Sequence, residues 1–338
     1  MQSLQEELQR QLRMSGSQAL LDKPGGVFIR RTDVMPEADV ILLKAVARVV
    51  FSAAKGTLDE QLRRRAAVKD LPNLLPSSSS KIKYPKILGT QPNLQFFNGF
   101  GGFTTEENHY VILLRDSQWT PAPWINVIAN DQDFGFLVSE AGAGYTWSTN
   151  SRENRLSSWS NDAISDPVSE AIYIRDEDTG EFWTPTPLPV REAEPYTITH
   201  AQGFSKFEHT SHGIASHLLM FVPRDASVKI SRLRLRNLGT LPRRLSVSSF
   251  VEWVLGFQRG VSAPSVITEK DPVTGALLAR NPYNNEFAGR VAFADLSETD
   301  RTYTCDRKEF LGRNGSPAEP EAMKRVGLSG RTGAGFDP

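Results

Sequence analysis

Short runs in which apolar residues occupy every second position dominate the chain from residue 110 onward. Phe134, Phe136 and Val138 recur at alternate positions, and Tyr196 and Ile198 repeat the same spacing. A period of two is typical of strands that bury one face. Turn residues, and not helices, separate these runs, which favours an antiparallel sheet protein over a parallel α/β fold. The sequence therefore predicts a mainly β domain, a sandwich of large antiparallel sheets.

The individual strands follow from the same alternation. They are expected at residues 110–114, 134–138, 172–174, 196–200, 214–222, 228–235 and 247–255. Between Ile230 and Leu233 the alternation slips by one residue, which predicts a β-bulge. Residues 247–255 are predicted to be one long strand. The pattern weakens beyond about residue 260, where 291–294 and 302–304 are further expected strands.

The N-terminal part of the chain has a helical period instead. Helices are expected over residues 3–14, 36–54 and 57–68; the first and last of these begin with capping boxes, Ser3 with Glu6 and Thr57 with Glu60. The serine run 77–80 between two prolines reads as a linker. We therefore expect a helical N-terminal segment and linker over 1–80, a boundary near 75–85, and the sandwich domain over 81–338.

Composition excludes several classes of protein. The 39 basic and 39 acidic residues balance, which argues against nucleic acid as a partner. The single cysteine, Cys305, rules out an internal disulfide framework and a multi-cysteine metal site. The sequence has neither a signal peptide nor an apolar run of the roughly 20 residues that span a bilayer, so we expect a soluble chain. The glycine-rich end, without a closing strand, suggests a piece of a longer protein.

Residues 98–190 hold five of the six tryptophans: Trp119, Trp124, Trp147, Trp159 and Trp183. Aromatic rings next to amide and carboxylate groups are typical of sugar sites, because the ring packs on C–H groups and the polar groups take the hydroxyls. The alternative is a tryptophan-rich sheet surface with polar turns. We expect Trp119, Trp124 and Trp183 to serve sheet packing.

The polar block from Thr149 to Glu170 is the strongest candidate site, because long polar loops in β proteins are usually functional or mobile. Its carboxylates Asp162, Asp166 and Glu170 could form the acid–base pair of a glycosidase, but sequence does not show their separation.

Other motifs favour structural roles. The glycines at 99, 101 and 102 precede a turn and a strand, not the helix that a phosphate loop needs, and indicate a tight entry to a strand. Residues 176–181 lack the later ligands of an EF-hand and predict a charged hairpin turn. His209, His212 and His217 lack a third close ligand and are expected on the sheet, not at a metal. No metal site and no catalytic residue is predicted.

Four motifs resemble glycoside hydrolase family 94, formerly glycosyltransferase family 36. They are Asn98–Phe103, Trp119–Trp124, Asn154–Asp162, and Glu170–Asp176 with Trp183–Pro185. Residues 27–31 and 38–54 also resemble the segment that precedes this module in cyclic β-1,2-glucan synthases. The resemblance spans about residues 25–338 and is strongest over 98–256.

The resemblance implies a galactose-mutarotase-like β-supersandwich and an inverting reaction at a β-glucosidic bond. In the family, inorganic phosphate is the co-substrate, no other cofactor is used, and the catalytic acid lies on an (α/α)6 barrel that follows the sandwich. This sequence ends before such a barrel, so no catalytic residue is transferred to it and the chain alone is expected to be inactive.

The resemblance also implies a substrate site shared between domains. In the phosphorylases a sandwich loop reaches into the active site of the partner subunit of a homodimer; the matching loop here is 149–166. The substrate-contact candidates are Arg155, Trp159, Asn161 and Asp162, and the expected ligand is a β-glucan or a glucose-containing oligosaccharide. The expected location is the cytoplasmic side of a larger inner-membrane enzyme.

Two alternatives remain open. The chain could be a freestanding carbohydrate-binding sandwich without catalysis. It could also be a mutarotase-like or glycosidase-like enzyme that uses His209, His212 or Glu170.

Overall fold

The computed structural model describes residues 2–15, 17–63, 93–162 and 164–338. The chain divides into two compact units, Met1–Lys81 and Ile82–Pro338, which are described separately below. The expected boundary at 75–85 and the serine linker lie outside the described residues.

The N-terminal unit consists of short helices. They are α1 (Gln2–Met14), η1 (Ser17–Leu20), η2 (Thr32–Val34), α2 (Glu37–Val46), η3 (Ala53–Lys55) and α3 (Leu58–Arg63). The capping box of α3 is confirmed: Thr57 N–H donates to the Glu60 carboxylate at 2.7 Å, and Glu60 N–H donates to the Thr57 hydroxyl at 3.3 Å. The remainder of the helix expected over 57–68 lies outside the described residues.

The helix predicted over 36–54 ends eight residues earlier than expected. α2 ends at Val46, and Ala47 is already extended, with φ −67° and ψ 131°. The residues that follow include Val49 and Val50, whose β-branched side chains lower helix propensity. No residue of α2 is buried, so packing does not compensate for this loss.

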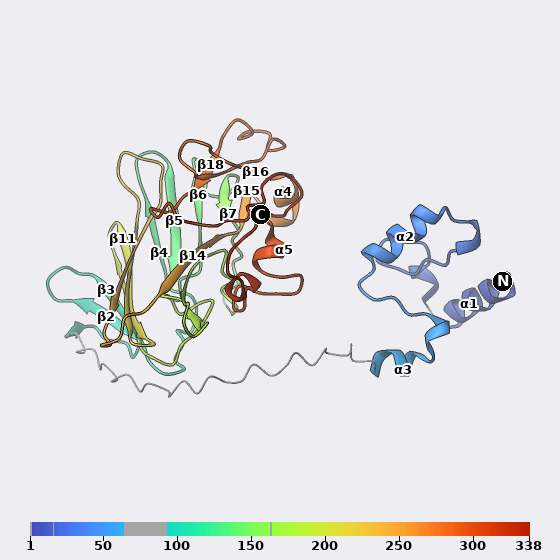
Figure 1. The fold of residues 1–338 in the computed structure, drawn as a ribbon, viewed down its shortest axis with the longest axis horizontal. Coiled ribbons are helices and arrows are strands. Elements are labelled where there is room, and N and C mark those ends of the chain that lie inside the picture. Colours follow the sequence, from blue (N-terminus) through green and yellow to red (C-terminus); the bar gives the residue numbers. More distant parts are fainter. Residues whose placement is uncertain (1, 16, 64–92, 163) are drawn as a thin grey trace. The chain divides into compact units, whose positions relative to one another are not determined.

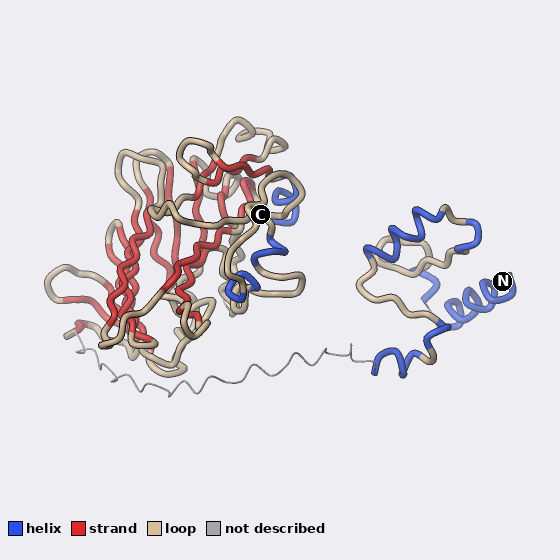
Figure 2. Tube along the Cα trace, viewed as in Figure 1, coloured by secondary structure: helices blue, strands red, loops and turns tan. Residues whose placement is uncertain are grey.

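The second unit is an antiparallel β-supersandwich, as predicted (Figures 1 and 2). One sheet has seven strands in the order β1-β2-β3-β10-β11-β12-β13, and a second has five in the order β15-β7-β6-β5-β4. Two three-stranded sheets, β14-β8-β9 and β16-β17-β18, complete the unit. The strands are β1 (Leu94–Gln95), β2 (Gly101–Thr104), β3 (Tyr110–Leu114), β4 (Ile125–Ala129), β5 (Phe134–Ser139), β6 (Gly144–Ser148), β7 (Arg155–Ser157), β8 (Glu170–Asp176), β9 (Phe182–Trp183), β10 (Tyr196–Ala201), β11 (Phe204–Ser211), β12 (Ile214–Phe221), β13 (Ile230–Asn237), β14 (Leu245–Val251), β15 (Trp253–Gly256), β16 (Ile267–Lys270), β17 (Leu277–Arg280) and β18 (Ala292–Ala294).

Two clusters of buried side chains hold the layers of the sandwich together. Ile112 of the seven-stranded sheet packs with Phe136 of the five-stranded sheet, and both are fully buried. Ile174 and Trp183 of the sheet β14-β8-β9 pack on Ile214 of β12. The seven-stranded sheet is therefore one layer, and the five-stranded sheet and β14-β8-β9 together form the layer that faces it.

Part of the C-terminal segment covers the outer face of the sheet β14-β8-β9. It contains α4 (Arg259–Ser262), η4 (Ala263–Ser265), α5 (Arg307–Phe310) and η5 (Glu321–Lys324). Asp306 caps α5 by accepting from Lys308 N–H at 2.9 Å. Phe310 and Met323 then pack against Tyr173 of β8.

Glu252 divides the predicted strand 247–255 between two sheets, so the prediction of one strand is wrong. β14 pairs with β8 before it, and β15 pairs with β7 after it. The Glu252 N–H donates to the Ser169 carbonyl at 2.8 Å, and its carbonyl accepts from Ser158 N–H at 3.1 Å. The apolar alternation runs through this position because both halves bury one face, and it does not reveal that the partner strand changes.

Two further strand predictions are corrected. The bulge expected between Ile230 and Leu233 is absent, because β13 pairs with β12 in an unbroken register and Ile230 lies on the opposite face of the sheet. Residues 302–304 form no strand. The Thr304 hydroxyl accepts from Asp306 N–H at 3.1 Å and donates to Glu309 at 2.8 Å. Such side-chain hydrogen bonds compete with a ladder.

The glycines before β3 act as predicted, at a tight entry to the sheet. A Cβ on Gly101 would lie 2.5 Å from the carbonyl oxygen of Val111, and one on Gly102 would lie 2.6 Å from that of Gln95. Only glycine allows this close approach of neighbouring strands.

The fully buried Trp183 allows a test of the packing between β9 and β12. Its indole N–H has no hydrogen-bond partner among the described residues, so its contribution is mainly packing. We expect Trp183→Ala to lower the free energy of unfolding by about 3–5 kcal/mol. We expect Trp183→Phe to lower it much less, because a ring still fills most of the space. Urea denaturation measures both values; an equal loss in the two variants would contradict this interpretation.

Candidate functional site

The sequence predicted one continuous polar loop over 149–170. The structure shows instead two loops separated by the short strand β7. Arg155 begins this strand and pairs with Trp147 of β6 on one side and Gly256 of β15 on the other. The position of Arg155 is therefore fixed by the five-stranded sheet, and only residues 149–154 and 158–169 connect strands.

Arg155 and Trp159 come together on an aromatic platform, which we define as Tyr145, Arg155 and Trp159. The guanidinium carbon of Arg155 lies 5.4 Å from the ring centroid of Tyr145 and 5.4 Å from that of Trp159. The two rings are 5.2 Å apart and tilted by 32°. Arg155 also donates to the carbonyl of Phe257 at 3.3 Å. These cation–π contacts hold a partly exposed tryptophan in a fixed orientation.

Asn161 and Asp162 lie on an exposed turn and are not bonded to the platform. Asp162 accepts from Ile164 N–H at 2.9 Å and from the Ser165 hydroxyl at 2.6 Å. These hydrogen bonds lower the pKa of Asp162, and they show that its carboxylate stabilises the turn. The side chain of Asn161 makes no hydrogen bond to the described residues.

Asp166 anchors the end of this second loop to β5. Its carboxylate accepts from the Ser139 hydroxyl at 2.6 Å, and its backbone adopts a left-handed φ of 39°. Glu140, which follows Ser139 in the chain, carries no sequence motif. It is buried and accepts from Trp124 N–H at 2.6 Å. Burial raises the pKa of both carboxyl groups.

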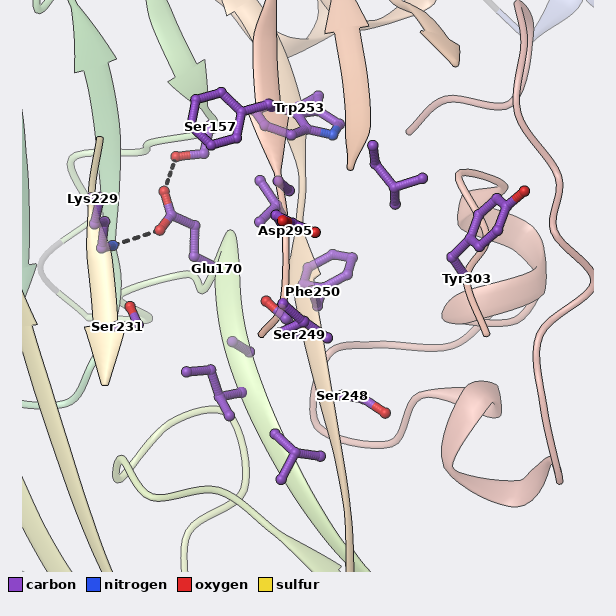
Figure 3. Close-up of a pocket in the computed structure, with 18 of the residues that line it drawn as sticks. Ser157, Glu170, Lys229, Ser231, Ser248, Ser249, Phe250, Trp253, Asp295 and Tyr303 are labelled. Atoms are coloured by element: carbon purple, nitrogen blue, oxygen red, sulfur yellow. Dashed lines mark hydrogen bonds and ion pairs between the residues drawn. The ribbon is translucent and has the colours of Figure 1, made fainter. Parts of the chain in front are cut away.

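Glu170 lies in a different environment, at the base of a crevice between the layers (Figure 3). Its carboxylate accepts from Lys229 Nζ at 2.6 Å, from the Thr146 hydroxyl at 2.7 Å and from the Ser157 hydroxyl. The Lys229 ammonium also lies 4.5 Å from the centroid of the Phe136 ring. No sequence motif marks Lys229, which comes from the other layer of the sandwich.

The charge state of Glu170 follows from these contacts. Burial by itself would raise its pKa, but the Lys229 ammonium and the two hydroxyl donors outweigh this effect and hold the pKa below its ordinary value. A general acid needs a proton near neutral pH, so an ionised, paired Glu170 is poorly suited to that role.

The three histidines serve packing and ion pairs. His209 stacks on Tyr196 with centroids 3.7 Å apart, and burial lowers its pKa to about 4. His212 lies 3.3 Å from both Glu181 and Glu192, and its pairing with the Glu192 carboxylate raises its pKa. His217 pairs with Glu208 on an exposed face.

Among the described residues, no group of three or more His, Cys, Asp or Glu side chains could hold a metal ion, and no helix is long and apolar enough to cross a membrane. Trp183 and Trp124 pack in the sandwich, as predicted. Trp119 does not: its ring is 43% exposed and is covered by Arg191, whose guanidinium carbon is 4.7 Å from the centroid.

We expect Glu170→Gln to destabilise the protein by about 3–5 kcal/mol at neutral pH, because it leaves the buried Lys229 charge without a counter-charge. The double variant with Lys229→Met should recover part of this loss. Because the pKa of folded Glu170 is lowered, its stabilising effect is present above the unfolded pKa of about 4.3 and disappears as the pH falls through the folded value.

Urea denaturation across the pH range tests this expectation. The control is Glu208→Gln, which removes a more exposed pair with Lys206, 2.8 Å away, and should cost at most about 1 kcal/mol. Equal losses in the two variants, or a difference that does not shrink in acid, would contradict the role assigned to the Glu170–Lys229 pair.

The sequence of residues 108–338 matches the family described as glycosyl hydrolase 94, supersandwich domain. The chain is 36% identical over 307 residues to the cyclic β-(1,2)-glucan synthase NdvB of Rhizobium meliloti, covering 88% of this chain and 11% of that protein. It is 27% identical to the N,N'-diacetylchitobiose phosphorylase of Vibrio proteolyticus, over 67% of this chain and 29% of that protein. It is 29% identical to the solabiose phosphorylase of Paenibacillus borealis, over 68% of this chain and 30% of that protein.

The chain thus spans less than a third of the length of these relatives. Its match nevertheless covers the whole of the sandwich from β3 onward, which holds both the aromatic platform and the crevice. The chain belongs to the glycoside hydrolase 94 supersandwich family.

Proposed function

We propose that this chain is the accessory sandwich region of an inverting family-94 phosphorylase module that acts on β-glucans. The catalytic acid then belongs to an (α/α)6 barrel elsewhere in the protein, inorganic phosphate is the co-substrate, and no catalytic residue lies in this chain. The part of this chain is to present the aromatic platform and the turn 161–166 to the substrate of a barrel, in the arrangement of a homodimer.

The platform is the observation that carries this proposal. Trp159 offers a partly exposed ring that Arg155 and Tyr145 hold in place, so little conformational freedom is lost when a sugar ring packs on it. Asn161 and Asp162 follow on the exposed turn, where polar groups can take sugar hydroxyls.

The pattern of similarity supports the proposed β-1,2 linkage. The match to the glucan synthase covers 88% of the chain, whereas those to the two phosphorylases cover 67% and 68%. The similarity to the synthase therefore extends into the N-terminal part, beyond the family domain that begins at residue 108. This extension supports β-1,2-glucan as the substrate. We further propose an inner-membrane protein as the parent, with this region on its cytoplasmic side.

The geometry favours this proposal over a mutarotase-like enzyme. The candidate acids and bases of such an enzyme already make other contacts: Glu170 pairs with Lys229, His209 stacks on the Tyr196 ring and His212 pairs with Glu192. A freestanding sugar-binding sandwich would use the same platform, and phosphorolysis assays of the full-length protein distinguish the two.

We expect Trp159→Ala in the full-length protein to lower kcat/KM for glucan phosphorolysis roughly 5- to 10-fold, as expected for the loss of about 1 kcal/mol of ring stacking. Thermal unfolding should change little, because the ring is only partly buried.

Trp119→Ala is the matched control, because it removes another exposed tryptophan covered by an arginine but lies outside the 149–166 block. Its kinetics should equal those of the wild type. Unchanged phosphorolysis in Trp159→Ala, or an equal loss in both variants, would remove the platform from the substrate site.

A further inference from the structure

The crevice at the open side of the sandwich is separate from the aromatic platform and has no assigned role. It lies where two sheet edges face each other: β13 ends the seven-stranded sheet, and β14 ends the sheet β14-β8-β9. Figure 3 shows Lys229 and Ser231 on one side, Ser249 of β14 on the other, and Glu170 between them.

The two layers separate at this side of the sandwich. Val247 pairs with Ile174, and Ser249 pairs with Ile172, so all four side chains lie on the face of the sheet that meets the seven-stranded layer. Ile174 is fully buried, but Val247 is 38% exposed and Ser249 is also exposed. A position that faces the inside of a sandwich and is still exposed borders an open crevice, not a packed core.

The base of the crevice carries unused hydrogen-bonding capacity. Among the described residues, Lys229 has a single hydrogen-bond partner, Glu170, although an ammonium group has three donors. The side chain of Lys229 is only 14% exposed, so little water reaches it. The hydroxyls of Ser231 and Ser249 likewise make no hydrogen bond to the part of the chain that the structure describes.

The charges of Lys229 and Glu170, at the bottom of the crevice, determine which class of ligand can bind there. Lys229 is neutralised by Glu170, so the crevice does not favour an anion such as phosphate. Free N–H and hydroxyl groups require a neutral ligand that both donates and accepts hydrogen bonds. Val247, which is 38% exposed, and Leu233 line the same crevice and add apolar surface. A sugar combines apolar C–H faces with hydroxyls and matches both features.

We propose that this crevice is a second carbohydrate site, which binds a segment of a β-glucan away from the aromatic platform. Lys229 donates to sugar hydroxyls at its base, Ser231 and Ser249 bind hydroxyls at its rim, and Val247 packs on a sugar face. The choice of glucan rests on the proposed function, but the site itself does not require the catalytic barrel.

Isothermal titration calorimetry of this chain with linear β-1,2-gluco-oligosaccharides of defined length tests the proposal. The blocking variant is Ser249→Trp, which fills the crevice from an exposed position and leaves the buried Glu170–Lys229 pair intact. Arg234→Trp is its control, because it places the same side chain at an exposed position of β13 that does not line the crevice. Thermal unfolding confirms that both variants are folded.

We expect the wild type, Arg234→Trp and Trp159→Ala to bind the oligosaccharides, and Ser249→Trp to bind at least roughly tenfold more weakly. Longer oligosaccharides should bind more tightly than glucose or a disaccharide. If Ser249→Trp proves unstable, Ser231→Trp blocks the opposite rim and should give the same result.

The proposal is overturned if the wild type does not bind, if folded Ser249→Trp binds as well as the wild type, or if Trp159→Ala abolishes binding. Failure of the two proposals is distinguishable. Loss of phosphorolysis in full-length Trp159→Ala, with no effect of Ser249→Trp on binding, would support the platform as a substrate site and reject the crevice site. Crevice binding with unchanged phosphorolysis in Trp159→Ala would leave only the crevice.

Discussion

The division of the sandwich depends on Glu252, the residue at which one strand passes from one sheet to another. Its N–H donates to Ser169, which precedes β8, and its carbonyl accepts from Ser158, which follows β7. Its carboxylate, 12% exposed, pairs with Arg259 at 2.9 Å and with Arg307. Because each backbone group of Glu252 bonds to a different sheet, the facing layer splits there. The five-stranded part carries the aromatic platform, and the three-stranded part borders the crevice.

The platform and the crevice use charge in different ways. Arg155 covers aromatic rings at a partly exposed position, where a cation–π contact orders a side chain without a large desolvation cost. Lys229 and Glu170 are mostly buried, and their attraction must offset the loss of hydration of both ions. Apolar residues could fill the position of this pair without the desolvation free energy that two buried charges require. A buried pair with unused donors therefore fits binding better than stability alone.

The strongly periodic strands were predictable from sequence. The corrections at 230–233 and 247–255 share one cause, which is the pairing with a partner strand. Residues 110–114 and 196–200 alternate because one side of the chain is buried, whatever partner buries it. The unbroken register at 230–233 and the change of partner strand at Glu252 depend on contacts with other parts of the chain. The helix end at Val46 follows instead from the local propensity of the residues after it. For the site, the Arg155–Trp159 spacing was visible, but Glu140 and Lys229 carry no local signature and were missed.

The sequence by itself determined the mainly β sandwich and the short N-terminal helices, because periodicity, capping residues and turn motifs are local properties of the chain. The resemblance of its motifs indicated the family. Only the tertiary structure decided which side chains meet. It joined Glu170 to Lys229, 59 residues away, and joined Arg155 to Phe257, 102 residues away. It also opened the crevice between two sheet edges. Such contacts depend on strand order and on the separation of the layers, which alternation along the chain does not encode.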